Sequence, residues 1–247
     1  MGDRVPEPLP EDVFAQEQAR PFQLFVTGTD TSVGKTQASC ALLSLLAEAG
    51  LRPQGFKPYE SGCKPLSAPA DALAMRAAAG SELPVDLLCP HRFRAPLAPG
   101  VAARRLGQEP DWNTTLACWE QLRHGPVVVE GAGGLFVPLD SRRDVIDLIA
   151  ALQVPVLLVA RAGLGTLNHT ALSLRALAER GLTVRAVLLS RSTPARDASE
   201  RDNRLLLEER HGLQVLGPVP FLKNARRRHT AFRAALSGLV PQRARGR

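Results

Sequence analysis

A lysine and a threonine, Lys35 and Thr36, end a glycine-bounded loop that directly follows an apolar segment. Residues 25–36 read FVTGTDTSVGKT. Glycines in such a loop let backbone N–H groups approach phosphate oxygens, and a helix beginning at its end adds a positive dipole. The Lys35 ammonium suits the β- and γ-phosphates, and the Thr36 hydroxyl is a suitable Mg²⁺ ligand. The pattern predicts a site for a nucleoside triphosphate.

The spacing of this loop departs from the usual pattern by one residue. Four residues normally separate the two glycines, whereas Gly28 and Gly34 enclose five, so Thr29 stands at the expected first glycine. A strand-to-helix turn that binds nothing is the alternative interpretation. The Lys35 and Thr36 side chains at the predicted helix start disfavour it.

Three further segments follow apolar runs and are expected at the same edge of a sheet. Lys57 ends one run, although a lone lysine there is often simply solvated. Glu130 ends VVVE beside a glycine-rich turn, where a carboxylate either binds Mg²⁺ or caps the turn. Residues 163–168 open a helix whose free N–H groups either bind an anion or form an ordinary capping turn through Thr166.

Alternating apolar runs and helical patterns must position these groups. Strands are predicted at residues 22–26, 54–57, 127–129, 154–160 and 184–189. Helices are predicted at residues 35–49, 71–79 and 112–122, and another opens at the 163–168 segment and runs to residue 180, with a loop at 84–99. The order indicates an α/β three-layer sandwich of the P-loop NTPase type, with a mainly parallel sheet covered by helices on both faces. Ligands of such sheets bind beyond the carboxyl ends of the strands.

Composition and charge indicate a disordered leader at residues 1–20, a catalytic domain at 21–222 and a basic tail at 223–247. The chain has 247 residues, 45% of them hydrophobic, and no long apolar run, so no membrane span is expected. Its net charge of +7 comes from the tail, which holds eight Lys or Arg and no acid. With one Tyr and two Trp in the chain, base stacking and hence nucleic acid are not expected, and the tail is expected to be solvated and partly helical.

The four cysteines are spaced widely along the chain and form no Cys-x-x-Cys pair. This spacing argues against a zinc site and against a disulfide scaffold. A cytoplasmic location is expected, because that compartment keeps thiols reduced.

Five segments together resemble the dethiobiotin synthetase family. They are FVTGTDTSVGKTQASCALL (25–43), GFKPYESG (55–62), ADAL (70–73), EGAGGLFVP (130–138) and GLGTLNH (163–169). GKT alone occurs in many unrelated nucleotide enzymes, whereas its combination with KP-x-x-SG and EGAGG is narrow.

The resemblance implies a role for each matching residue. Catalysis would use Lys57 and Lys35. ATP would be held by Thr31, Ser32, Val33, Gly34, Lys35, Thr36, Glu130, Gly131 and Gly133, with Ser190 at the position of the family's adenine reader. Mg²⁺ would be bound by Thr36, Asp71 and Glu130. An acid such as Asp71 at the start of a helix usually only interacts favourably with the helix dipole and binds no metal. Substrate contacts would come from Ser61, Gly133, Gly134, Gly163, Leu164, Gly165 and Thr166.

The reaction implied by the resemblance is the ATP-dependent carboxylation of 7,8-diaminononanoate with CO₂ or bicarbonate to give dethiobiotin, ADP and phosphate. One amine forms a carbamate, the carbamate oxygen attacks the γ-phosphate, and the neighbouring amine closes the ring and releases phosphate. Lys35, Lys57 and Mg²⁺ would offset the charge of the two anions, so no protein nucleophile is needed. The family also implies a homodimer in which the segment at 163–166 receives the substrate carboxylate across the interface.

Departures from the family's pattern and two other classes of protein bear on this interpretation. Ser32 replaces a frequent acid, and Ser190-Arg191 replaces an Asn-Asp that reads adenine. A dimeric switch ATPase of the partitioning or cobyrinate-synthesis type usually carries an extra lysine early in the loop, where this chain has residues 29–31. A metabolite kinase usually carries an Arg-rich lid, and residues 84–99 offer only Arg92 and Arg94.

Overall fold

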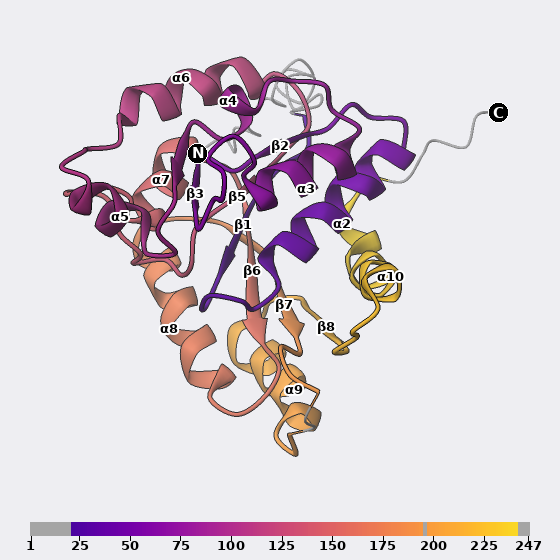
Figure 1. The fold of residues 1–247 in the computed structure, drawn as a ribbon. Helices are drawn as coiled ribbons and strands as arrows, with labels where there is room; N and C mark the ends of the chain where they lie inside the picture. The colour runs from indigo at the N-terminus through magenta and orange to yellow at the C-terminus, as the bar shows by residue number, and fades with distance from the viewer. Residues whose placement is uncertain (1–20, 195–196, 242–247) are drawn as a thin grey trace, which may run out of the picture.

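The computed structural model describes residues 21–194 and 197–241. The predicted leader at residues 1–20 therefore lies outside the described residues, as do residues 242–247 of the predicted tail. The central sheet has six parallel strands in the order β2-β5-β1-β6-β7-β8 (Figure 1). They are β1 (Gln23–Gly28), β2 (Gln54–Phe56), β5 (Val127–Glu130), β6 (Val156–Arg161), β7 (Val184–Ser190) and β8 (Val215–Val219).

Helices cover both faces of this sheet, as Figure 1 shows. One face carries α2 (Lys35–Glu48), α3 (Ala70–Ala79) and α10 (Ala225–Leu236). The other carries α6 (Trp112–Leu122), α7 (Val145–Leu152), α8 (Thr166–Glu179) and α9 (Glu200–His211). The predicted three-layer α/β fold is confirmed, and the strands predicted from the sequence occur within two residues of their expected bounds.

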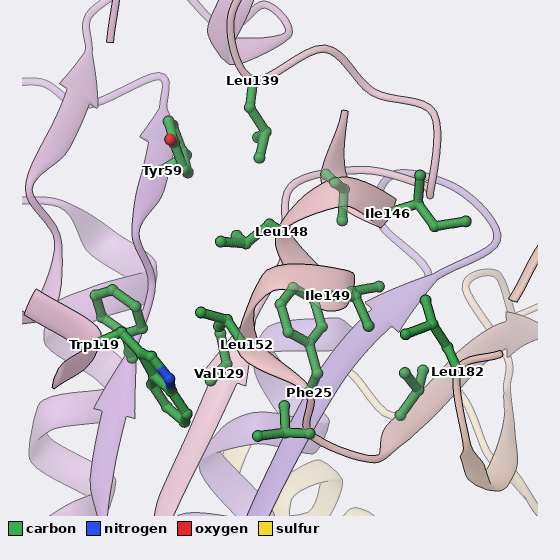
Figure 2. Packing of buried hydrophobic residues seen from close by; sticks show 14 of the residues in the cluster. Phe25, Tyr59, Trp119, Val129, Leu139, Ile146, Leu148, Ile149, Leu152 and Leu182 are labelled. Carbon is green, nitrogen blue, oxygen red and sulfur yellow. The ribbon is translucent and has the colours of Figure 1, made fainter. Parts of the chain in front are cut away.

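The core explains why β1 is apolar at every position rather than at alternate ones. Leu24 and Val26 pack against α2, whereas Phe25 between them packs against α7 on the opposite face. Figure 2 shows Phe25 among Val129, Ile149 and other buried hydrophobic residues on the α7 face of the sheet. A strand buried on both faces cannot alternate between apolar and polar residues.

The predicted loop at residues 84–99 contains regular structure, so that prediction is wrong for part of the segment. It includes α4 (Val85–Leu88) and β4 (His91–Phe93), and α5 (Pro99–Arg105) begins at its end. Strand β4 pairs in parallel with β3 (Tyr59–Ser61) to form a separate two-stranded sheet. Elements of three or four residues are too short to show a periodic pattern, and the surrounding prolines suggest a loop.

Helix α10, which lies within the part of the chain predicted to be a solvated and partly helical tail, packs against the domain. Phe232 and Leu236 of α10 are buried in the same core cluster as α2. Arg233 pairs with Glu48 at the end of α2. The net charge of this segment did not indicate the packing, because only two residues of α10, Phe232 and Leu236, are buried, one helical turn apart. Within the described residues, every helix is too short or too polar to cross a membrane.

Candidate active site

Strand register brings the predicted site residues to one edge of the sheet. In the parallel pairs, Val26 of β1 lies beside Glu130 of β5, and Phe56 of β2 lies beside Val129. Glu130 is therefore the last residue of the strand between the phosphate loop and Lys57. The convergence follows from the all-parallel arrangement, in which the carboxyl ends of the strands share one edge.

Lys57 and Glu130 form a buried ion pair. The Lys57 Nζ atom donates to Glu130 Oε1 at 2.7 Å and to the Gly131 carbonyl at 2.8 Å. It also lies 3.6 Å from Asp71 Oδ2, whose side chain is 41% exposed. Burial lowers the pKa of Lys57, but the Glu130 and Asp71 carboxylates outweigh burial, so the net shift is upward. The ammonium group is thus held protonated at the edge of the sheet.

Lys35 is buried, and no carboxylate of the described residues is hydrogen-bonded to it. Its Nζ atom donates to the Asp30 carbonyl at 2.8 Å, across the phosphate loop. Burial and then the nearby Lys57 ammonium lower its pKa to about 8. The protein therefore holds a second cation in a place that disfavours charge, as expected of a group whose anionic partner arrives with a ligand.

The phosphate loop leaves the first N–H groups of α2 without a side-chain cap. The N-cap residue Gly34 has φ 106°, and Ser32 also adopts the left-handed conformation, with φ 60°. A side chain on Gly34 would meet Phe232 of α10 at 3.0 Å. Uncapped N–H groups at the start of a helix of this length form an anion site.

A cavity of about 690 Å³ unites most of the predicted residues. Its lining includes Thr31, Ser32, Gly34, Lys35, Thr36, Lys57, Ser61, Asp71, Glu130 and Gly133. Of the other predicted residues nearby, Val33 is buried in the core and Gly131 accepts the Lys57 hydrogen bond through its carbonyl. Gly133 has φ 63°, and a Cβ on it would meet Val137 at 2.6 Å, so the turn that borders the cavity requires glycine.

The oxygen groups around Glu130 fit a hard divalent cation. Thr36 Oγ1 donates to Glu130 Oε1 at 2.9 Å, and Asp71 lines the same cavity. The second carboxylate oxygen, Glu130 Oε2, is buried and has no hydrogen-bond partner among the described residues. A hydroxyl and two carboxylates are ligands that Mg²⁺ prefers, usually together with waters and phosphates.

Other predicted residues lie away from this cavity. Gly163 and Leu164 line a second cavity with Arg161 and Asp197, and the Leu164 N–H donates to the Asp197 carboxylate at 2.7 Å. Gly165 is the N-cap residue of α8. Two further residues, Thr166 and Ser190, are buried, and Ser190 Oγ would lie 3.2 Å from a Cβ on Gly34. Gly134, at the turn after β5, would place a Cβ 3.4 Å from the Gly28 carbonyl.

Several residues that line the cavity were not among those predicted from the sequence to form the site. Tyr59 and Glu60 of β3 line it, as do residues 96–99, the last of which begins α5. Glu60 stands in the GFKPYESG segment, so its position was visible, but nothing in its spacing indicated what its carboxylate contacts. Residues 96–99 carried no polar signal, because Pro96, Leu97, Ala98 and Pro99 are all apolar.

Comparison with known proteins identifies the family. A family model described as an AAA domain matches residues 22–228. An ATP-dependent dethiobiotin synthetase BioD of Anaeromyxobacter dehalogenans is 44% identical over 88% of this chain and 98% of its own length. The protein of the same name from Bacillus subtilis subsp. natto is 36% identical over 81% of this chain and 87% of its own length.

Solved structures share the fold at much lower identity. A cobyrinic acid a,c-diamide synthase from Mycobacterium smegmatis, solved with ADP and magnesium, has a TM-score of 0.51 at 17% identity, covering 87% of this chain and 91% of that one. This likeness concerns the α/β fold alone. The alignments with the two dethiobiotin synthetases cover most of this chain and most of each relative. They confirm the resemblance found in the motifs: the chain belongs to the dethiobiotin synthetase family.

Proposed function

We propose that this protein is an ATP-dependent dethiobiotin synthetase, a ligase of biotin biosynthesis that converts 7,8-diaminononanoate, CO₂ and ATP to dethiobiotin, ADP and phosphate. Family membership supports the overall reaction. The observation that carries the mechanism is the pair of buried cations, Lys35 and Lys57, on the lining of one cavity.

The two lysines suit a reaction between anions. A carbamate formed on one amine attacks the γ-phosphate, so negative charge accumulates between the two reacting groups. Lys35, at the uncapped start of α2, would hold the phosphates, and Lys57, on the neighbouring strand end, would lie between the γ-phosphate and the carbamate. Preorganised cations stabilise this charge without having to reorient during the reaction.

We assign the binding of Mg²⁺ to Thr36, Asp71 and Glu130. The ion would offset negative charge on the nucleotide phosphates, and Glu130 would share its carboxylate between the ion and Lys57. The Glu130 Oε2 atom, which has no hydrogen-bond partner in the part of the chain that the structure describes, supports this assignment. Asp71 supports it through its position 3.6 Å from Lys57.

Substrate contacts are proposed for two parts of the chain. Ser61 and the turn at residues 133–134 belong to the main cavity region, and the buried Ser61 Oγ has no hydrogen-bond partner among the described residues. The start of α8, with Gly163, Leu164, Gly165 and Thr166, would receive the substrate carboxylate of a partner subunit. Its place outside the main cavity of its own chain agrees with a contribution in trans.

Phosphate release tests the proposed reaction. Purified protein with ATP, Mg²⁺ and bicarbonate is expected to release phosphate only when the vicinal diamine acid is added, because the γ-phosphate has no acceptor until a carbamate forms. Mass spectrometry should find dethiobiotin in the same reaction. Hydrolysis that proceeds equally without the diamine would support a switch ATPase, and a phosphorylated small molecule as the final product would support a kinase.

The proposed homodimer predicts that a charged residue on the α8 surface weakens dimerisation. Leu164, just before α8, and Leu172, within it, are 78% and 59% exposed, so this region presents two large apolar side chains to solvent. Sedimentation velocity should give twice the 26.6 kDa chain mass, and Leu172→Arg should shift the protein towards monomer. Leu106→Arg, at an exposed leucine after α5, is the matched control and should remain dimeric. A wild-type protein that sediments as a monomer at assay concentration would contradict the assembly.

A cytoplasmic location is part of the proposal. The four cysteines are all free thiols in the structure, and Cys63, Cys89 and Cys118 are buried. Thiols in this state agree with a reducing compartment.

A further inference from the structure

Glu60 is a buried carboxylate whose hydrogen bonds go to a different element of the fold. It lies in β3 and is 5% exposed. Its two oxygens accept the backbone N–H groups of Asp71 and Ala72, at 3.0 and 2.9 Å. Both of these residues belong to the first turn of α3, ten or more residues further along the chain.

Helix α3 lacks a cap of its own. Its N-cap residue is Pro69, which makes no side-chain cap hydrogen bond because proline has no polar side-chain atom. A capping side chain normally accepts the N–H groups of the second and third helical residues. Those residues here are Asp71 and Ala72, so Glu60 takes the place of the missing cap from a neighbouring strand.

The cap determines where the Asp71 side chain lies. Asp71 Oδ2 is 3.6 Å from Lys57 Nζ, and both residues line the main cavity with Glu60. Glu60 accepts the backbone N–H group of Asp71, the same residue that carries this carboxylate. Freeing that turn would let Asp71 move relative to Lys57 and Glu130, which are fixed by their own ion pair.

We propose that Glu60 is a positioning residue, which caps α3 from strand β3 and so holds the Asp71 carboxylate in the active site. The inference rests on the proposed function, because it concerns the cation site to which Asp71 is assigned. Glu60 acts through Asp71 and contributes no group to the chemistry itself.

Kinetics of Glu60→Ala test this role, with phosphate release and the dependence on Mg²⁺ concentration as readouts. The variant is expected to lose roughly 10- to 100-fold in kcat, the scale for a small misplacement of a reacting constellation. The Mg²⁺ concentration for half-maximal rate should rise, whereas ADP affinity in the presence of EDTA should stay as in the wild type. Loss of the cap should also lower Tm by about 2–4 °C.

A second substitution separates positioning from direct contact. Pro69→Ser supplies a hydroxyl at the N-cap, so Glu60→Ala/Pro69→Ser should recover most of the kcat and the Mg²⁺ dependence. Pro69→Ser alone is the matched control. In addition, Glu60→Ala should cost little further activity in an Asp71→Asn background, because two residues acting as a unit are not additive.

Three results would overturn the inference. They are wild-type kcat and Mg²⁺ dependence in Glu60→Ala, additive losses with Asp71→Asn, or recovery of Tm without kcat in the double variant, which would mean that Glu60 contacts the substrate. A wild-type protein that releases no phosphate with the diamine would instead refute the proposed function. In that case the Tm values of the same variants still test the cap.

Discussion

Replacing Lys57 by alanine is expected to lower kcat severely while nucleotide binding persists. The phosphate loop and Lys35 remain, so ATP and ADP should bind with nearly wild-type affinity in calorimetry. The lost ammonium group is expected to cost about 2–4 kcal/mol of transition-state stabilisation, or roughly 30- to 1000-fold in kcat. Single-turnover phosphate release would measure this loss directly.

Folding must be separated from chemistry in this variant. Lys57→Ala leaves the buried Glu130 carboxylate without its cation, and such a loss destabilises a protein by about 3–5 kcal/mol. Lys57→Gln keeps a donor for Glu130 and removes the charge, so it should unfold at a higher temperature than Lys57→Ala and still show the loss in kcat. Lys64→Ala, at an exposed lysine seven residues along the chain, should behave as wild type. Loss of ADP binding in well-folded Lys57→Gln would contradict the assigned role.

Replacing Lys35 by methionine is expected to stabilise the nucleotide-free protein and to disable it. The ammonium group lies at the uncapped start of α2, where ATP phosphates are proposed to bind, so affinity for ATP and kcat/KM should both fall. A loss of about 2–4 kcal/mol, or roughly 30- to 1000-fold in kcat/KM, is expected. Titration with a fluorescent ATP analogue, followed by steady-state assays, would measure the two effects.

The direction of the stability change follows from the pKa of Lys35. Burial lowers that pKa from 10.5 to about 8, so the folded state binds the proton less tightly than the unfolded state. The cost to stability is therefore present in full below pH 8 and is relieved as the pH rises from about 8 towards 10.5. Lys35→Met should raise the free energy of unfolding by about 1–3 kcal/mol at pH 7 and by less at pH 10. A variant less stable than wild type at pH 7 would contradict this account.

The direction of the strands alone was enough to predict that several candidate residues would lie together. Lys35, Lys57 and Glu130 each follow an apolar run, and parallel strands bring such positions to one edge whatever the details of packing. Glu60 was different. Its hydrogen bonds to Asp71 and Ala72 depend on how β3 lies against the start of α3, and no local pattern specifies that contact.

The edges of the fold were harder to predict for a related reason. Strand β8 reads VLGPV, and the Gly and Pro within it hide the apolar signal. Helix α10 begins ARRRH, so its charge dominates, and only Phe232 and Leu236 reveal its buried side. In both cases tertiary packing outweighs local propensity, because the neighbouring strand or helix supplies the apolar partner.

Phe232 of α10 lies so close to the phosphate loop that a Cβ on Gly34 would meet its ring at 3.0 Å. Arg228 adds a hydrogen bond to Gln37 of α2, 191 residues earlier in the sequence. During synthesis the phosphate loop emerges from the ribosome early, but its packed surroundings are complete only after residue 232 has been made. The nascent chain must therefore keep an unfinished nucleotide site until α10 has been translated.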